Sequence, residues 1–221
     1  MNIWFNNYNW EIDEVFWNEL FCRKVRILIL VGSSGAGKST ITDYLYNNFE
    51  EYYEIRNVTT RKPREYENKT HSFIFLSTEE YLELLSKRQF AWAKYGNYPY
   101  YGYPKYEFTY LAENFKIGIL SFHHNGAALF AKLFEKHILE ANNISFVFIN
   151  GDTKLINNHS NDREGLASFN KTQFEKYQNS QLSMSLSSKG VRVLNVYNDY
   201  EPHTIGKISN IIRQWMVLRY D

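Results

Sequence analysis

Short runs of apolar residues alternate along the chain with segments whose apolar residues recur at helical spacing. The runs predict strands at 25–31, 55–59, 73–76, 117–122, 144–149 and 191–197. Recurrence every three or four residues predicts helices at 11–20, 38–46, 77–85, 127–138 and 205–215. Strands that alternate with helices in this way are typical of an α/β protein with a mainly parallel sheet.

Two segments depart from this alternation. Residues 90–110 are rich in Tyr, Gly and Pro, which predicts turns and short strands around a pocket. Residues 152–171 are polar and have no apolar period, as expected of a mobile segment. No internal repeat or linker separates parts of the chain, so we expect a single domain over residues 1–221.

The charge balance and the cysteine count narrow the class of protein. The 25 Lys and Arg residues nearly cancel the 24 Asp and Glu residues, so there is no electrostatic case for nucleic-acid binding. Cys22 is the one cysteine, which excludes an intramolecular disulfide. No signal-peptide pattern and no membrane-length apolar run is present. We therefore expect a soluble, cytoplasmic monomer or homodimer whose partners are small molecules.

A glycine-rich loop joins the strand at 25–31 to the helix that begins near Lys38. Gly32, Gly37, Lys38 and Ser39 match the phosphate-loop pattern G-x-x-x-x-G-K-[ST]. Glycines let backbone N–H groups turn toward phosphate oxygens, and the helix N-terminus adds partial positive charge there. The pattern predicts that Lys38 contacts the β- and γ-phosphates of ATP and that the Ser39 hydroxyl ligates Mg²⁺. The predicted nucleotide-binding residues are Gly32, Ser33, Ser34, Gly35, Ala36, Gly37, Lys38, Ser39 and Thr40.

A second cationic motif follows about twenty residues later. Arg61 and Arg64 occur in Thr59-Thr60-Arg61-Lys62-Pro63-Arg64, where their spacing lets two guanidinium groups converge on one phosphate. The guanine-specific N-K-x-D sequence of switch GTPases is absent from the chain. The arginine pair therefore favours an enzyme with two phosphate sites over a simple nucleotide switch.

Together these motifs resemble the guanylate kinase family, in which T-T-R-x-P-R binds the phosphate of the acceptor. Phe90 to Gly102 matches the family's F-x-E-…-G-N-Y-Y-G stretch without a gap, which places Tyr101 at a phosphate-binding tyrosine. Asn198-Asp199 matches the family's N-D after the last strand. The resemblance implies phosphoryl transfer from ATP to a monophosphate. It also implies a P-loop core at 25–56, 114–151 and 173–221, an N-terminal extension at 1–24, an acceptor-binding insert at 57–113 and a lid at 152–172.

Several positions depart from that family pattern. Trp92 aligns with the guanine-reading Glu, and Tyr103 with the Ser or Thr after Tyr-Tyr-Gly. Ser121-Phe122-His123 replaces D-x-D, and Phe73 replaces a second phosphate-binding tyrosine. Arg163 is the one arginine left in the lid, where it is expected to stabilise transferred charge. The expected acceptor-site residues are Arg61, Arg64, Phe73, Trp92, Tyr101, Tyr103, Ser121 and His123.

These departures leave two classes of function open. The first is an ATP-dependent kinase of a nucleotide or sugar phosphate other than GMP, with Lys38, Arg61, Arg64 and Arg163 as its catalytic residues. The second is a weak or inactive guanylate-kinase-like module that binds nucleotide or protein. An intact Lys38-Ser39 pair favours the kinase. The aromatic residues between 92 and 110 either stack on an acceptor or form the core of the insert.

Overall fold

The computed structural model describes residues 9–63, 72–135, 143–164 and 169–217. The chain divides into two compact units. The smaller unit comprises Met1–Val25 and Glu54–Lys116, and the larger comprises Arg26–Tyr53 and Ile117–Asp221. Among the described residues, no helix is long and apolar enough to cross a membrane.

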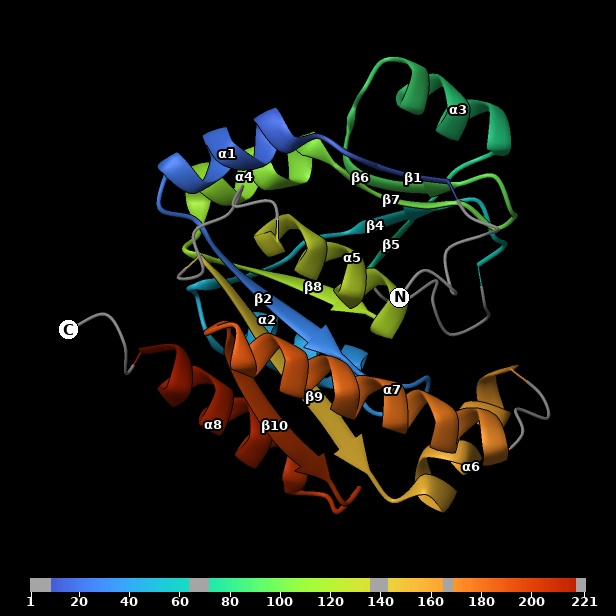
Figure 1. The fold of residues 1–221 in the computed structure, drawn as a ribbon, viewed down its shortest axis with the longest axis vertical. Coiled ribbons are helices and arrows are strands. Elements are labelled where there is room, and N and C mark those ends of the chain that lie inside the picture. The colour runs from blue at the N-terminus through green and yellow to red at the C-terminus, as the bar shows by residue number, and fades with distance from the viewer. Residues whose placement is uncertain (1–8, 64–71, 136–142, 165–168, 218–221) are drawn as a thin grey trace. The chain divides into compact units, whose positions relative to one another are not determined.

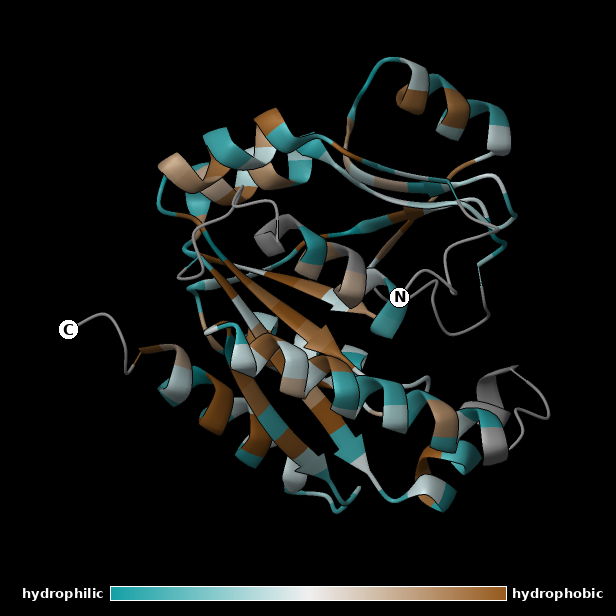
Figure 2. Ribbon diagram, in the orientation of Figure 1, coloured by the Kyte–Doolittle hydropathy of each residue, from teal (hydrophilic) through white to brown (hydrophobic). Residues whose placement is uncertain are grey.

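The larger unit is built on a sheet with strand order β10-β9-β2-β8-β3 (Figure 1). Its strands are β2 (Arg26–Val31), β3 (Tyr52–Glu54), β8 (Ile117–Phe122), β9 (Ile144–Gly151) and β10 (Arg192–Asn198). The pairs β2–β8, β2–β9 and β9–β10 are parallel, which confirms the expected parallel sheet. Strand β2 is apolar along most of its length, because helices cover both of its faces (Figure 2).

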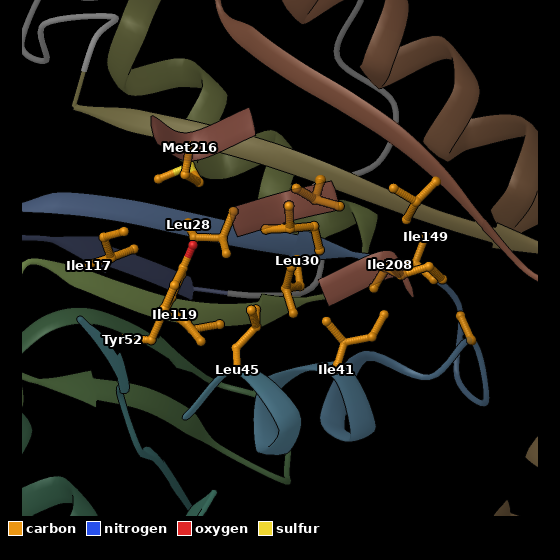
Figure 3. Close-up of a cluster of buried hydrophobic side chains, with 14 residues drawn as sticks. Leu28, Leu30, Ile41, Leu45, Tyr52, Ile117, Ile119, Ile149, Ile208 and Met216 are labelled. Atoms are coloured by element: carbon orange, nitrogen blue, oxygen red, sulfur yellow. The ribbon is translucent and has the colours of Figure 1, made fainter. Parts of the chain in front are cut away.

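Helices pack on both faces of this sheet. They are α2 (Lys38–Asn48), α5 (His124–Glu135), α7 (Phe169–Ser188) and α8 (Thr204–Val217), and α6 (Thr153–Glu164) packs against α7. Helices α2 and α8 share one core cluster with the central strands, which includes Leu28, Leu30, Ile41, Leu45 and Ile208 (Figure 3). On the other face, the ring of Phe122 contacts that of Phe130 in α5, with centroids 5.1 Å apart. The α/β fold predicted from the sequence is therefore present.

The smaller unit has its own, mainly antiparallel sheet with strand order β1-β6-β7-β4-β5 (Figure 1). Its strands are β1 (Asn9–Ile12), β4 (Asn57–Thr59), β5 (Phe73–Phe75), β6 (Phe90–Tyr95) and β7 (Tyr101–Pro104). Its helices are α1 (Glu14–Cys22), α3 (Thr78–Ser86) and α4 (Lys105–Asn114). Helix α3 begins with the predicted capping box, in which Ser77 and Glu80 bond each other's backbone N–H groups. A core cluster around Tyr81 and Phe90 packs against one face of the sheet.

The N-terminal segment folds differently from the helix predicted at 11–20. Asn9–Ile12 form the edge strand β1, and Asp13 caps α1 by accepting a hydrogen bond from the Phe16 N–H. Trp17 is fully buried, whereas Val15 is 67% exposed although its apolar side chain fits the helical spacing of the segment. Ile12, which the sequence placed in the helix, instead pairs with Trp92 of β6, so the helix starts later than predicted.

Three helices were not predicted. Helix α4 lies in the segment expected to hold only turns and strands, and its buried residues include Phe108 and Leu111. Helix α7 follows a segment without apolar period, and its buried positions include the polar residues Thr172, Asn179 and Ser183. Polar residues on a buried helix face leave no hydrophobic period for a sequence pattern to detect. Helix α6 likewise occupies part of the segment at 152–171 that lacks such a period.

Candidate functional site

The phosphate loop lies between the end of β2 and the start of α2, as the sequence predicts. Gly35 and Gly37 have φ angles of 82° and 97°, a backbone region that glycine adopts without steric cost. Gly37 is also the N-cap of α2 and provides no side-chain cap, so the first N–H groups of the helix are available to a ligand. This arrangement gives the loop the geometry of an anion site.

The side chains of the loop differ in their exposure. The Lys38 ammonium donates hydrogen bonds to the carbonyl oxygens of Gly32 and Ser33, at 2.7 and 2.9 Å. Ser39 and Thr40, in the first turn of α2, are exposed. The Ser33 hydroxyl is buried and has no hydrogen-bond partner among the residues that the structure describes. A buried hydroxyl in this position fits a loop that completes its hydrogen bonds with a bound anion.

Residues beyond β10 hold the loop in this shape. The Asn198 side-chain amide donates to the Ala36 carbonyl oxygen at 3.1 Å, and the Tyr200 hydroxyl donates to that of Gly35 at 2.8 Å. The Tyr200 N–H in turn donates to the Asn198 side-chain oxygen at 3.0 Å. Sequence reasoning noted Asn198-Asp199 as a motif but did not assign these contacts, and it missed Tyr200. The parallel sheet supplies the link, because the carboxyl ends of β2 and β10 lie at the same edge.

Ser121 and His123 lie near the carboxyl end of β8 in the larger unit. The Ser121 hydroxyl is 3.4 Å from that of Thr42 in α2, and His123 is exposed just after the strand. Burial lowers the pKa of His124, the next residue, because desolvation disfavours its charged form. Among the described residues, no group of three or more His, Cys, Asp or Glu side chains is arranged to hold a metal. The contact of Ser39 with Mg²⁺ stays a prediction.

In the smaller unit, strand register places most of the predicted acceptor residues on one face of the sheet. Thr59 pairs with Tyr101 and with Phe75, and Tyr101 pairs with Lys94. Directly paired residues point to the same face, as do residues two apart on one strand. We call this the aromatic face, and its rings are Trp10, Phe73, Phe75, Trp92, Tyr101 and Tyr103.

Arg61 lies over one end of the aromatic face. Its guanidinium carbon is 4.7 Å from the ring centroid of Phe73 and 5.4 Å from that of Phe75. The chain leading to it is fixed because the Thr60 N–H donates to the Tyr100 carbonyl oxygen at 3.2 Å and the Thr60 hydroxyl accepts from the Tyr100 N–H at 2.9 Å. Arg61, Phe73 and Tyr101 are thus on one surface of one unit. Arg64, the predicted partner of Arg61, lies outside the described residues.

Trp92 and Tyr103 are the buried part of the aromatic face. They are 3% and 2% exposed, and their ring centroids are 5.7 Å apart. Trp10 covers Trp92 from the neighbouring strand β1, with centroids 5.2 Å apart. Trp92 and Tyr103 therefore belong to the core of this unit, which is one of the two roles that the sequence left open for the aromatic residues between 92 and 110. Contact of either ring with an acceptor stays a prediction.

One carboxylate near this sheet is held by an arginine. Glu107 in α4 is 1% exposed and accepts hydrogen bonds from the Arg56 side chain at 2.9 and 2.5 Å and from the Arg56 N–H at 3.0 Å. Glu107 is the carboxylate that would read a guanine ring if the alignment of the insert were shifted. Its contacts with Arg56 give it a structural partner instead.

A family model for guanylate kinase matches residues 24–184 of the chain. The chain belongs to the guanylate kinase family. Among relatives, guanylate kinase of Helicobacter pylori strain 26695 is 45% identical over 80 residues, which cover 36% of this chain and 38% of the relative. That of Clostridium tetani is 35% identical over 103 residues, or 46% of this chain and 48% of the relative. The chain is thus matched over less than half the length of these relatives.

The crystal structure of guanylate kinase from Anaplasma phagocytophilum has a TM-score of 0.59 to this guanylate kinase family member. The two are 20% identical, and the match covers 87% of each chain, which supports the fold. The residues matched by the family model include helix α6, which contains Arg163. The side chain of Arg163 lies outside the described part of the structure. Strand β1 and helix α1 precede the matched residues, although β1 completes the same sheet as Tyr101.

Proposed function

We propose that this protein transfers a phosphoryl group from ATP to a phosphorylated small molecule, a nucleotide or a sugar phosphate. The observation that carries the proposal is the phosphate loop, with Gly35 and Gly37 in the left-handed region, Lys38 at the helix start and an unpartnered Ser33 hydroxyl. Mg²⁺ bound with the nucleotide would neutralise charge on its phosphates. The protein's part is positioning and electrostatic stabilisation, because phosphoryl transfer needs no protein nucleophile.

Each residue has a role in this proposal. Lys38 exchanges its bonds to the loop carbonyls for bonds to donor phosphates, and Ser39 offers its exposed hydroxyl to the metal. Arg61 and Tyr101 hold the phosphate of the acceptor on the aromatic face. Arg64 joins them in the proposal on the strength of its spacing in the sequence.

We further propose that the acceptor is not GMP, although the names of the relatives suggest guanylate. A guanine ring presents N–H donors that a carboxylate accepts well, and Trp92 supplies no acceptor at the aligned position. The nearby carboxylate of Glu107 is bound by Arg56. Without that carboxylate, a guanine site would favour guanine only weakly over other groups.

The segment at 152–172 is proposed as the lid, with Arg163 in helix α6 as its arginine. Lids of this kind close over bound nucleotides on microsecond to millisecond timescales and exclude water. Hydrogen exchange in this segment should slow when ATP and an acceptor are bound together. Exchange that is identical with and without both ligands would contradict a lid.

The test of the function is an ADP-release assay on the purified protein with ATP, Mg²⁺ and one acceptor at a time. The acceptors are GMP, dGMP, AMP, CMP, UMP and ribose phosphates, and Lys38→Ala is the inactive control. We expect turnover on at least one acceptor other than GMP. Turnover on GMP at the usual kinase rate of about 1–100 s⁻¹ would contradict the choice of acceptor. Absence of ATP and GTP binding by calorimetry would contradict the function, and ATP binding without any turnover would favour an inactive module.

A further inference from the structure

Lys94 is a cation on the aromatic face that belongs to neither the phosphate-loop motif nor the arginine motif. Its partner on β1 is Trp10 and its partner on β7 is Tyr101, so its side chain lies between theirs on the same face. The Lys94 ammonium nitrogen is 5.4 Å from the ring centroid of Tyr101. Lys94 therefore sits directly beside a residue to which we assign acceptor binding.

The backbone of this pair is fixed from the opposite face of the sheet. The hydroxyl of the fully buried Tyr81 in α3 lies 2.7 Å from the Tyr101 carbonyl oxygen and 3.2 Å from that of Lys94. One side chain thus holds the two neighbouring strands at the point where Lys94 and Tyr101 stand. A ligand that meets both residues would find their backbones already in place, which lowers the entropic cost of binding.

The charged side chain that strands β1, β4, β5, β6 and β7 place on the aromatic face is positive. Glu11 is the acidic residue in strands β1, β4, β5, β6 and β7, and its pairing with Ala93 places it on the opposite face. Lys94 and Arg61 contribute positive charge on either side of Tyr101 and Thr59. Burial lowers the pKa of Lys94, because desolvation disfavours its ammonium form, and an anion beside it would offset that effect.

Lys94 and Arg61 stand apart across the sheet. Lys94 and Phe75, over which Arg61 is stacked, stand on strands three positions apart, roughly 14 Å at about 4.8 Å per strand. Tyr101 stands between the two cations, so a phosphate held by Arg61 meets Tyr101 from one side while Lys94 flanks Tyr101 on the other. The arrangement suits a molecule with one anionic group at each end.

We propose that Lys94 binds a second anionic group of the acceptor, at the end opposite the phosphate held by Arg61. The acceptor is then a phosphorylated small molecule that carries another phosphate or a carboxylate. This inference rests on the proposed function, because it takes the aromatic face to be the acceptor site. Lys94 is the residue that determines specificity for that second group.

The test is direct binding by calorimetry to matched pairs of ligands, without turnover. The first pair is fructose 6-phosphate and fructose 1,6-bisphosphate, and the second is glucose 6-phosphate and 6-phosphogluconate. The pairs distinguish an added phosphate from an added carboxylate. The variants of the full chain are Lys94→Met, which keeps the length but removes the charge, Lys94→Arg, which keeps the charge, and Lys116→Met, an exposed lysine of the same unit.

We expect the wild-type protein to bind the doubly anionic member of at least one pair about tenfold more tightly, the size of a charge-assisted hydrogen bond. Lys94→Met should abolish that preference, Lys94→Arg should retain part of it, and Lys116→Met should retain all of it. Equal affinity for both members of each pair in the wild type, or no binding of any probe at millimolar concentration, would overturn the proposal. Equal weakening of both members by Lys94→Met would place Lys94 on the first phosphate and would also overturn it. An Arg61→Ala variant that binds every probe as the wild type does would instead contradict the proposed function.

Discussion

The side-chain amide of Asn198 donates a buried hydrogen bond to the carbonyl oxygen of Ala36, 162 positions earlier in the chain. The same amide nitrogen lies 2.7 Å from the place that a Cβ atom on Gly37 would occupy. Gly37 also has a φ of 97°, so glycine is required there both by backbone conformation and by the approach of Asn198. The phosphate loop and the end of β10 are thus fitted to each other.

A Gly37→Ala substitution should therefore reduce stability and also ATP affinity. The left-handed conformation alone costs a residue with a Cβ about 1 kcal/mol, and displacing Asn198 adds to that cost and distorts the loop. Gly190→Ala is the matched control, because Gly190 has a φ of 77° but nothing within 4 Å of its Cβ position. Urea unfolding and calorimetry should show a loss of stability in both variants and a loss of ATP binding in Gly37→Ala alone. Normal ATP binding by Gly37→Ala would contradict the role assigned to this contact.

Arg61→Ala should weaken acceptor binding and leave ATP binding nearly unchanged. The substitution removes a guanidinium that already lies over Phe73 and Phe75, and a charge-assisted contact to phosphate is worth about tenfold or more in affinity. Arg64→Ala should act in the same direction. Arg23→Ala, at an exposed arginine of the same unit, is the control for net charge. Equal loss of ATP and acceptor affinity would mean that Arg61 serves the donor or the fold.

Glu107→Gln should lower the stability of the protein without a selective effect on any acceptor. The substitution weakens the paired hydrogen bonds to Arg56, and bonds of this charged kind contribute roughly 1.5–3 kcal/mol. Glu113→Gln, at an exposed position in the same helix, should change the free energy of unfolding by less than about 0.5 kcal/mol. If Glu107→Gln instead kept full stability and altered KM for one acceptor, Glu107 would be a reader of that acceptor.

The ion pair between Asp13 and Lys105 predicts a dependence of stability on acid pH. Burial by itself raises the pKa of Asp13, but hydrogen bonds from Lys105 and from the Phe16 N–H outweigh it, so the pKa lies below its ordinary value of 3.8. The pair, at 2.6 Å, then stabilises the folded state fully above that ordinary pKa. This stabilisation is lost as the pH falls through the lower, folded-state value.

Asp13→Asn isolates this effect, because asparagine remains a good N-cap but carries no charge. The free energy of unfolding should differ between wild type and variant by about 0.5–1 kcal/mol at neutral pH, and the difference should vanish in acid. Lys105→Met should reproduce the same pH profile from the other side of the pair. A difference that stayed constant from neutral pH to below pH 3.8 would show that the charge of Asp13 contributes nothing.

The phosphate loop could be found from the sequence because its requirements are local. Gly32 to Ser39 need particular residue types at fixed spacing, between a strand and a helix that their own apolar patterns predict. Strand β8 was predicted at its observed bounds, Ile117–Phe122, for the same reason. Helix α7 was missed because its buried face is partly polar, so packing rather than hydrophobic period determines it.

The sequence by itself thus predicted phosphate-binding residues, Arg61 and Tyr101 among them, and only the tertiary structure decided which side chains share a surface. Arg61, Lys94 and Tyr101 come from three separate segments, and their common face follows from strand pairing. A shift of one residue in that register would send each side chain to the opposite face. Asn198 and Ala36 meet for a similar reason, because the parallel strands bring their carboxyl ends to one edge of the sheet. Pairing between distant segments depends on the whole fold, so no local pattern of residues encodes it.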